Sequence, residues 1–139
     1  MRKRYNADRV YIWQFHNGGS FYTSSPMQKI SITYERCSQG LERRIEKNQN
    51  QLITNYNSYI KDVIDGNMFY QDISKMRDIG LRSLTQSNGT KSHCAVPIYD
   101  KETHLVAMLC LDWVWSEVPS KYLKKDGFFT QDFIEEFSK

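Results

Sequence analysis

The chain contains little of what identifies several common classes of protein. Only three of its 139 residues are prolines and only three are cysteines. Cys37, Cys94 and Cys110 are odd in number and widely spaced, which gives neither a disulfide framework nor a zinc-site pattern. No apolar run approaches the roughly 18 residues of a membrane-spanning helix, and the N-terminus lacks the pattern of a signal peptide. Together these features predict a cytoplasmic protein with reduced thiols.

The chain also lacks an excess of charge of either sign. Its 19 basic and 16 acidic residues leave a net charge of +3, too balanced to indicate a nucleic-acid partner. A hydrophobic content of 40% and an aromatic content of 14% argue against disorder. A chain of this length buries about 70% of the surface that its unfolded form exposes. We therefore expect a single domain over residues 1–139.

The most informative segment is Ser92–Trp115. Two apolar runs are separated by a short polar break at residues 100–103, which predicts a β-hairpin. The second run is apolar on both faces, as expected for a central strand that is covered on both sides. Asp112 is the only carboxylate late in this run, and it suggests a ligand pocket at the strand end. Cys94 and Cys110 are expected to face each other across the hairpin.

Two further strands are predicted in the first third of the chain. Residues 9–16 are apolar on both faces, and residues 29–37 alternate between apolar and polar side chains, which predicts a half-exposed strand antiparallel to the first. The side chains expected to point inward are Ile30, Ile32 and Tyr34, and those expected to point outward are Ser31, Thr33 and Glu35.

Helices are indicated between and after these strands. An amphipathic pattern predicts a helix from Tyr56 to Ile64, capped by Thr54 or Asn55, after a loop or loose helix at residues 39–51. Residues 67–86 are ambiguous between a short strand and a helix that Gly80 weakens. A turn at residues 87–89 and a final helix at residues 130–137 complete the order. This order predicts an α+β fold with a central antiparallel sheet.

Three strings in this order resemble the GAF domain family. They are GLRSL at Gly80–Leu84, AVPI at Ala95–Ile98 and HLVAMLCLD at His104–Asp112. The resemblance covers residues 8–137 and implies a GAF/PAS-like fold, with helices mainly on one face of the sheet and a small-molecule pocket on the other. Two further strings, ADRVYIWQFHNGG at residues 7–19 and ISITYE at residues 30–35, resemble a subgroup of GAF-like proteins of bacteria and phages, mostly without assigned function.

In that subgroup a membrane or coiled segment often precedes the domain. The abrupt start of the sequence is therefore compatible with a fragment of a longer protein, whose only membrane contact would be a segment outside this chain. Terminal helices of GAF-like domains often pair, which makes a homodimer an expected partner.

Candidate ligand-binding residues lie first at the end of the strand at residues 9–16. His16 and Asn17 precede a pair of glycines, where a ligand can approach the backbone closely. The alternative is a turn with a solvated His16. Tyr34 belongs to an aromatic set that either packs in the core or stacks on a planar ligand.

Arg82, Ser83 and Asp112 form the second candidate group. Arg82 either anchors an anionic ligand or makes a structural salt bridge to Asp112 or Asp78. If the family register holds, Arg82 is the only permanent cation expected near Asp112. Asp112 itself is expected to be paired or open to solvent, because isolated burial of a carboxylate is costly.

Nothing in the sequence favours catalysis. The three histidines are scattered, no serine or cysteine has a local base, and His93 and Cys94 point to opposite faces of a strand. No metal-ligand spacing is present, so no cofactor or metal is expected. The sequence therefore predicts a non-catalytic ligand-binding or sensor domain. The alternative is a structural or protein-interaction domain that keeps the GAF fold without a ligand.

Overall fold

The computed structural model describes residues 6–16, 29–65, 69–70 and 72–118. Six strands form one sheet in the order β3-β2-β1-β6-β5-β4, and all neighbouring pairs are antiparallel. The strands are β1 Arg9–His16, β2 Lys29–Cys37, β3 Gln51–Leu52, β4 Phe69–Tyr70, β5 Ser92–Tyr99 and β6 Leu105–Trp113. The helices are α1 Asn57–Ile64 and α2 Ile79–Ser87, with 3₁₀ turns η1 Ile53–Tyr56 and η2 Ile73–Lys75.

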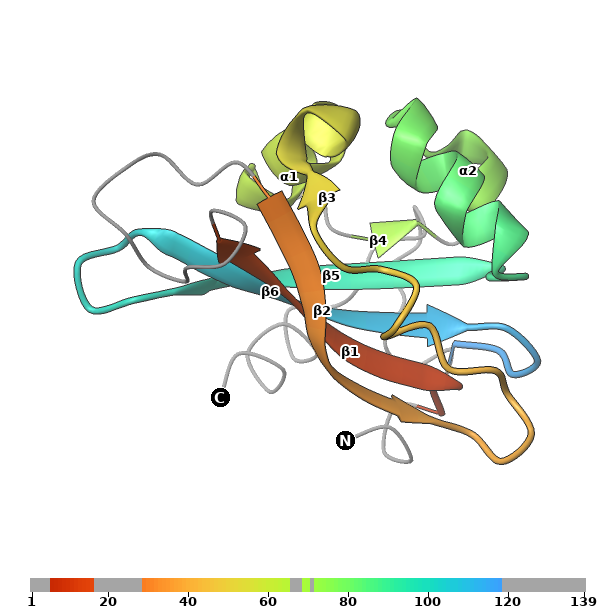
Figure 1. The fold of residues 1–139 in the computed structure, drawn as a ribbon. Helices are drawn as coiled ribbons and strands as arrows, with labels where there is room; N and C mark the ends of the chain where they lie inside the picture. The colour runs from red at the N-terminus through yellow and green to blue at the C-terminus, as the bar shows by residue number, and fades with distance from the viewer. Residues whose placement is uncertain (1–5, 17–28, 66–68, 71, 119–139) are drawn as a thin grey trace.

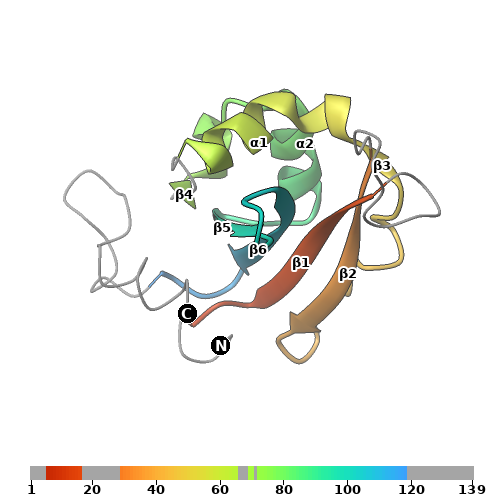
Figure 2. The same cartoon turned by 90° about the vertical axis from the view of Figure 1, so that its left-hand side faces the viewer.

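Both α-helices lie over the same face of the sheet, as Figures 1 and 2 show from two directions. The central pair is β1 and β6, which are the two strands whose sequences are apolar on both faces. The expected α+β fold, with an antiparallel sheet and helices on one face, is confirmed. Within the described residues, no helix is long and apolar enough to cross a bilayer.

The main core lies between the sheet and the helices. Tyr11, Trp13 and Phe15 alternate along β1 and all point toward the helices, as the period of a strand requires. They pack with residues from the neighbouring elements, namely Ile30, Ile32, Tyr56, Tyr59, Val63, Ile73, Met76, Leu81, Ala95, Met108 and Cys110.

A β-bulge in β2 overturns part of the predicted alternation. Ile12 pairs with Tyr34 and Trp13 pairs with Ile32, so Thr33 is an extra residue. One extra residue in a strand moves every side chain that follows it to the face opposite the one that simple alternation predicts. Tyr34, predicted inward, is therefore 41% exposed on the face away from the helices, and Glu35, predicted outward, is buried against the helix side. Ser31, also predicted outward, is buried on the far face.

The helix α1 begins after a 3₁₀ turn, not at the cap predicted from Thr54 or Asn55. Its N-cap residue is Tyr56, which makes no side-chain capping bond. The start of α2 is better defined, because the Asp78 carboxylate accepts hydrogen bonds from the N–H groups of Leu81 and Tyr59, both at 3.0 Å. Asp78 thus caps α2 and ties it to α1.

Gly80, which weakened the helix prediction, is needed where it stands. A Cβ atom there would lie 2.2 Å from the carbonyl oxygen of Asn55, so α2 approaches the η1 backbone too closely for any side chain. The short strand predicted near residue 69 is present as β4, and the turn after α2 includes Gly89 at φ +76°.

The predicted pairing of two cysteines is wrong. Cys94 is opposite Leu111 and Cys110 is opposite Ala95, so the two thiols lie on opposite faces of the sheet. Both are free and buried. The predicted helix at residues 130–137 lies outside the described residues.

Candidate functional site

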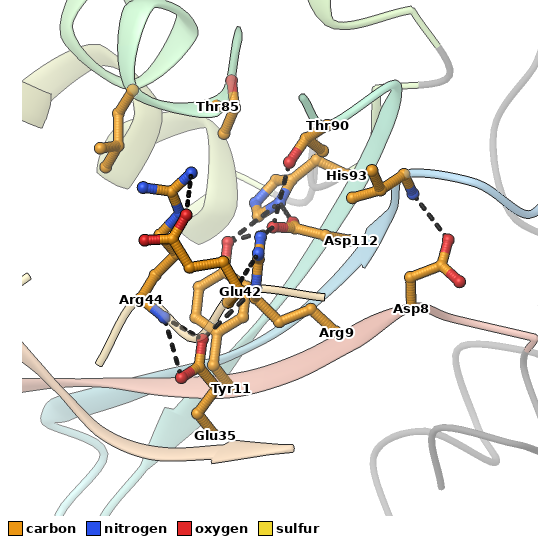
Figure 3. A network of polar contacts seen from close by, with 12 residues as sticks. Asp8, Arg9, Tyr11, Glu35, Glu42, Arg44, Thr85, Thr90, His93 and Asp112 are labelled. Atoms are coloured by element: carbon orange, nitrogen blue, oxygen red, sulfur yellow. Dashed lines mark hydrogen bonds and ion pairs between the residues drawn. The ribbon is translucent and has the colours of Figure 1, made fainter. Parts of the chain in front are cut away.

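A cluster of buried polar side chains lies on the helix-facing side of the sheet, at one end of its central strands. Arg9, Asp112 and His93 occupy the same row, because Asp112 is opposite Arg9 on β1 and His93 on β5. All three are at most 1% exposed. We call these residues, with Tyr11, Glu35, Tyr59 and Thr90, the Asp112 cluster, and Figure 3 labels all of its members except Tyr59.

The Asp112 carboxylate accepts four hydrogen bonds from protein groups. Oδ1 accepts from His93 Nδ1 at 2.7 Å and from the Tyr11 hydroxyl at 3.1 Å. Oδ2 accepts from Arg9 Nη1 and from the Thr90 hydroxyl, both at 3.3 Å. The cost of burying this carboxylate is therefore offset by one permanent cation and three further donors.

Arg9 links Asp112 to a second buried carboxylate, that of Glu35. Arg9 Nε lies 3.3 Å from Glu35 Oε2, and Arg9 Nη2 donates to the carbonyl of Glu42 at 2.9 Å. The Glu35 carboxylate also accepts two backbone hydrogen bonds. The N–H of Arg44 donates to Oε2 at 2.9 Å, and the N–H of Ile45 donates to Oε1 at 3.1 Å. These bonds hold the loop after β2 against the end of the sheet.

The charges of the cluster are reflected in its pKa values. Burial opposes the charged form of Arg9, but the Asp112 carboxylate together with Tyr11 and Cys37 outweighs this and raises the Arg9 pKa above its ordinary value. Burial, and then the charge of Asp112, raises the pKa of Tyr11 well above its ordinary value. Arg9 therefore stays charged and Tyr11 stays a hydrogen-bond donor.

A chain of hydrogen-bonding groups continues from Asp112 into the core. His93 Nε2 lies 2.6 Å from the Tyr59 hydroxyl, which lies 3.6 Å from Cys110 Sγ. This order of carboxylate, imidazole and hydroxyl resembles a nucleophile–base arrangement. However, Tyr59 and Cys110 are at most 1% exposed, and burial raises the pKa of both groups. This series of hydrogen bonds is therefore suited to positioning α1, and its buried groups are not suited to attack on a substrate.

An open depression lies beside the cluster, where η2, the end of α2 and the start of β5 meet. Its volume is about 450 Å³, within the range of small-molecule sites. It is lined by Asp72, Ile73, Ser74, Gln86, Thr90, Lys91, Ser92 and Glu117, and we call it the β5 depression. Thr90 belongs to both features, because it lines the depression and donates its hydroxyl proton to Asp112.

The predicted ligand-binding residues do not meet in one place. Asp112 lies on the helix side of the sheet, whereas His16 and Tyr34 lie on the far side by the register of β1 and β2. His16 is buried, with Nε2 2.7 Å from the Ser31 hydroxyl. Asn17 lies outside the described residues.

Arg82 is not the cation that pairs with Asp112. Its Nη1 donates to the carbonyl of Met76 at 3.5 Å, and Ser83 is exposed on α2. The prediction was wrong because Arg9, adjacent to Asp112 in the β1–β6 register, already supplies the charge.

Sequence reasoning missed Arg9, Tyr11, His93 and Thr90 as partners of Asp112. A signal for two of them was present in the chain, because Arg9 and Tyr11 share the face of β1 that carries the core aromatics. A charged residue in that register requires an opposite charge on the neighbouring strand. Without the β1–β6 register, that neighbour cannot be identified.

One group of side chains in the described residues has the composition of a metal site. Ligand atoms of Asp100, Glu102 and His104 lie within 4.8 Å of one another in the β5–β6 turn. Glu102 and His104 are exposed, and Asp100 Oδ1 already accepts the N–H groups of both residues. This geometry is that of a turn closed by its own aspartate.

Neither a protein-family model nor a curated protein matches the sequence. Solved structures do match the fold. The GAF domain of PixJ from Thermosynechococcus elongatus has a TM-score of 0.65 at 17% identity, over 99% of this chain and 71% of that one. The chromophore-binding domain of a bacteriophytochrome from R. palustris has a TM-score of 0.64 at 10% identity, over 99% and 48%.

A third match is the hypothetical protein SA1058 from S. aureus, with a TM-score of 0.57 at 13% identity, over 85% of this chain and 90% of that one. Matches of this extent at such low identity establish the architecture. The chain therefore has the fold of GAF domains, as its sequence strings implied.

Proposed function

We propose that this GAF-fold domain is a non-catalytic small-molecule-binding or regulatory module. The fold is one that binds ligands elsewhere, as in the chromophore-binding domain of the R. palustris bacteriophytochrome. In the described residues, the ionisable groups nearest to a catalytic arrangement are buried in the Asp112 cluster and bonded to one another. A substrate therefore has no access to them.

The observation that carries this proposal is the position of Thr90. It is the residue at which the open β5 depression meets the buried Asp112 cluster. A ligand in the depression would change the surroundings of a hydroxyl that is bonded to the central carboxylate. Because that carboxylate joins β1, β5 and β6, binding would be transmitted to the sheet and to α1.

Among the six predicted ligand-binding residues, Asp112 has a place in this proposal through its bond to Thr90. Binding roles for His16, Asn17, Tyr34, Arg82 and Ser83 remain predictions. A location in the cytoplasm also remains a prediction, supported by the three free cysteines.

A thermal-shift screen of nucleotides, cyclic dinucleotides, amino acids and sugars tests the proposal. A ligand at 100 times its Kd stabilises the native state by about 2.7 kcal/mol, which raises the Tm of a domain of this size by several degrees. The proposal fails if no class raises the Tm and backbone amide NMR spectra show no shifts with the same compounds.

The second candidate is a protein-interaction domain that keeps the fold without a ligand. It is favoured by large apolar side chains exposed on the two helices, where Ile79 is 69% and Ile64 is 50% exposed. Homodimerisation through terminal helices is the form predicted from the sequence. Light scattering distinguishes the candidates, because a monomer that binds a metabolite would exclude the interaction-only role.

A further inference from the structure

We infer that the bend at residues 114–116, directly after β6, is a carboxylate-binding site, and that Asp8 fills it as an internal ligand that latches the bend to the start of β1. This site goes beyond the proposed function, because neither its geometry nor its occupant depends on a ligand in the β5 depression. Asp8 lies to one side of the Asp112 cluster, as Figure 3 shows.

The donors of the bend converge on one carboxylate. Asp8 Oδ2 accepts the backbone N–H groups of Val114, Trp115 and Ser116 at 2.8, 2.7 and 2.9 Å. Asp8 Oδ1 accepts the hydroxyl protons of Ser116 at 3.1 Å and of Ser38 at 3.3 Å. Successive backbone N–H groups that point to one position form a nest, which is a concavity that binds anions.

Hydrogen bonds, and not a positively charged side chain, hold the Asp8 carboxylate. Asp8 is 3% exposed, so its charge is largely removed from water. No ion pair between described residues includes it. A buried carboxylate is stable under these conditions only where donors satisfy its oxygens. The bend therefore recognises the carboxylate group itself, and a free carboxylate of similar size would satisfy the same donors.

The backbone of Asp8 is fixed independently of its side chain. The Asp8 N–H donates to the carbonyl of Asp112 at 2.9 Å, and the Asp8 carbonyl accepts the N–H of Ser38 at 2.8 Å. Because the carboxylate is carried by a backbone that is already in place, little freedom is lost when it binds the bend. An alanine at position 8 keeps both backbone bonds and leaves the donors of the bend without their acceptor.

The same contact is the main polar link between the bend and the rest of the domain. Every hydrogen bond that the structure gives to the backbone N–H groups of the bend ends on Asp8. Trp115 is 57% exposed, so apolar burial of this side chain holds the bend only weakly. The next residue, Glu117, contacts Asn6 and Lys91 at exposed positions. Loss of the Asp8 carboxylate should therefore release the bend while β1 and β6 stay paired.

The test is NMR hydrogen exchange of single backbone amides in the native chain and in Asp8→Ala, with and without sodium formate. In the variant, amides 114–116 should exchange at least tenfold faster, because each loses a hydrogen bond to a charged acceptor, while amides within β6 stay protected. Formate replaces the deleted carboxylate, so it should restore protection of amides 114–116 in a saturable manner. Sodium chloride at equal ionic strength should not restore it.

Two controls accompany this comparison. Formate should leave amides 114–116 of the native chain unchanged, because Asp8 occupies the site. Asp100→Ala removes another carboxylate that accepts backbone N–H groups, in the exposed β5–β6 turn. It should leave exchange at residues 114–116 at the native rate, with or without formate.

Native exchange rates at residues 114–116 in Asp8→Ala would show that the bend is held without Asp8 and would overturn the latch. Lost protection that formate restores no better than chloride would overturn the carboxylate site. If Asp8→Ala does not fold, Asp8→Asn replaces it, since asparagine keeps an acceptor oxygen and loses only the charge. A neutral acceptor forms bonds about half as strong, so these amides should still exchange several-fold faster, and native rates would overturn the latch.

Discussion

The two ends of the interface between sheet and helices are built by different physical means, although the same strand β1 supplies both. At one end, Arg9 and Tyr11 enter the Asp112 cluster, where charged and polar groups are matched atom by atom. At the other end, Trp13 and Phe15 pack against apolar side chains such as Met108. Both ends are buried to a similar degree.

The difference shows what each end contributes. Apolar burial stabilises the fold in proportion to area and accepts replacements of similar volume. A buried ionic cluster adds little net stability, because desolvation opposes the attraction, but it is intolerant of losing any one partner. The polar end therefore specifies how β1, β5 and β6 align, and the apolar end supplies most of the stability.

The largest effect should come from breaking the polar end. Arg9→Met leaves the carboxylates of Asp112 and Glu35 buried without their cation, and we expect a loss of about 3–5 kcal/mol in the free energy of unfolding. Urea denaturation measures it. Arg36→Met, at an exposed arginine over the Tyr34 ring, is the control and should cost less than about 1 kcal/mol.

Double-mutant analysis identifies the cause. If Arg9 acts through Asp112, the combination of Arg9→Met with Asp112→Asn should cost clearly less than the sum of the single changes. Additive losses would show that the two side chains are not coupled and that the cluster is a set of independent contacts.

A smaller loss is expected at the apolar end. Met108→Ala removes a fully buried side chain and should cost about 2–4 kcal/mol. Met108→Leu keeps the volume and should cost less than about 1.5 kcal/mol. Arg9→Lys, the equivalent conservative change at the polar end, should cost more than Met108→Leu, because lysine cannot reproduce the guanidinium contacts. The reverse order would contradict the comparison.

Asp8 sharpens the comparison, because backbone groups and not side-chain charges hold its carboxylate. Its Oδ2 accepts the N–H groups of Val114, Trp115 and Ser116 at 2.7–2.9 Å. Burial alone would raise the Asp8 pKa, but these hydrogen bonds outweigh it and lower the pKa below 3.8. The stabilisation is present above that value and is lost as the pH falls through the lowered pKa.

Asp8→Asn should therefore cost about 1–2 kcal/mol at pH 7. The difference between the native protein and the variant should shrink as the pH is lowered from 5 toward 2. Denaturant melts across this range measure it. A difference that does not change with pH would mean that the carboxylate charge contributes nothing.

The smallest effect is expected at Thr90. Thr90→Val removes one of four donors to Asp112 while Arg9 remains, so we expect a loss of about 1 kcal/mol in unfolding free energy. The same substitution should reduce the binding free energy of any ligand of the β5 depression by more than it reduces the free energy of unfolding. Thermal melts with and without ligand measure both quantities. An unchanged ligand affinity would mean that binding in the depression is not coupled to the Asp112 cluster.

The apolar end could be predicted from the sequence more fully than the polar end. The boundaries of β1 and β2 and the buried faces of β1 and β6 follow from strand periodicity, and all of these agree with the structure. The partner of Asp112 does not follow from periodicity, because it depends on which residues of two distant strands are opposite each other. The short segments η1 and η2 were missed for a related reason, since four residues or fewer show no helical period.

The bulge at Thr33 has a consequence for how related sequences should be aligned. Because Thr33 is the extra residue, its loss would leave a regular strand in which Tyr34 still pairs with Ile12 and Glu35 still faces Arg9. Position 33 is therefore the place in β2 where a gap of one residue keeps every paired side chain on its present face. A relative that keeps the Arg9–Glu35 pair should therefore align across this strand either without a gap or with a single gap at position 33.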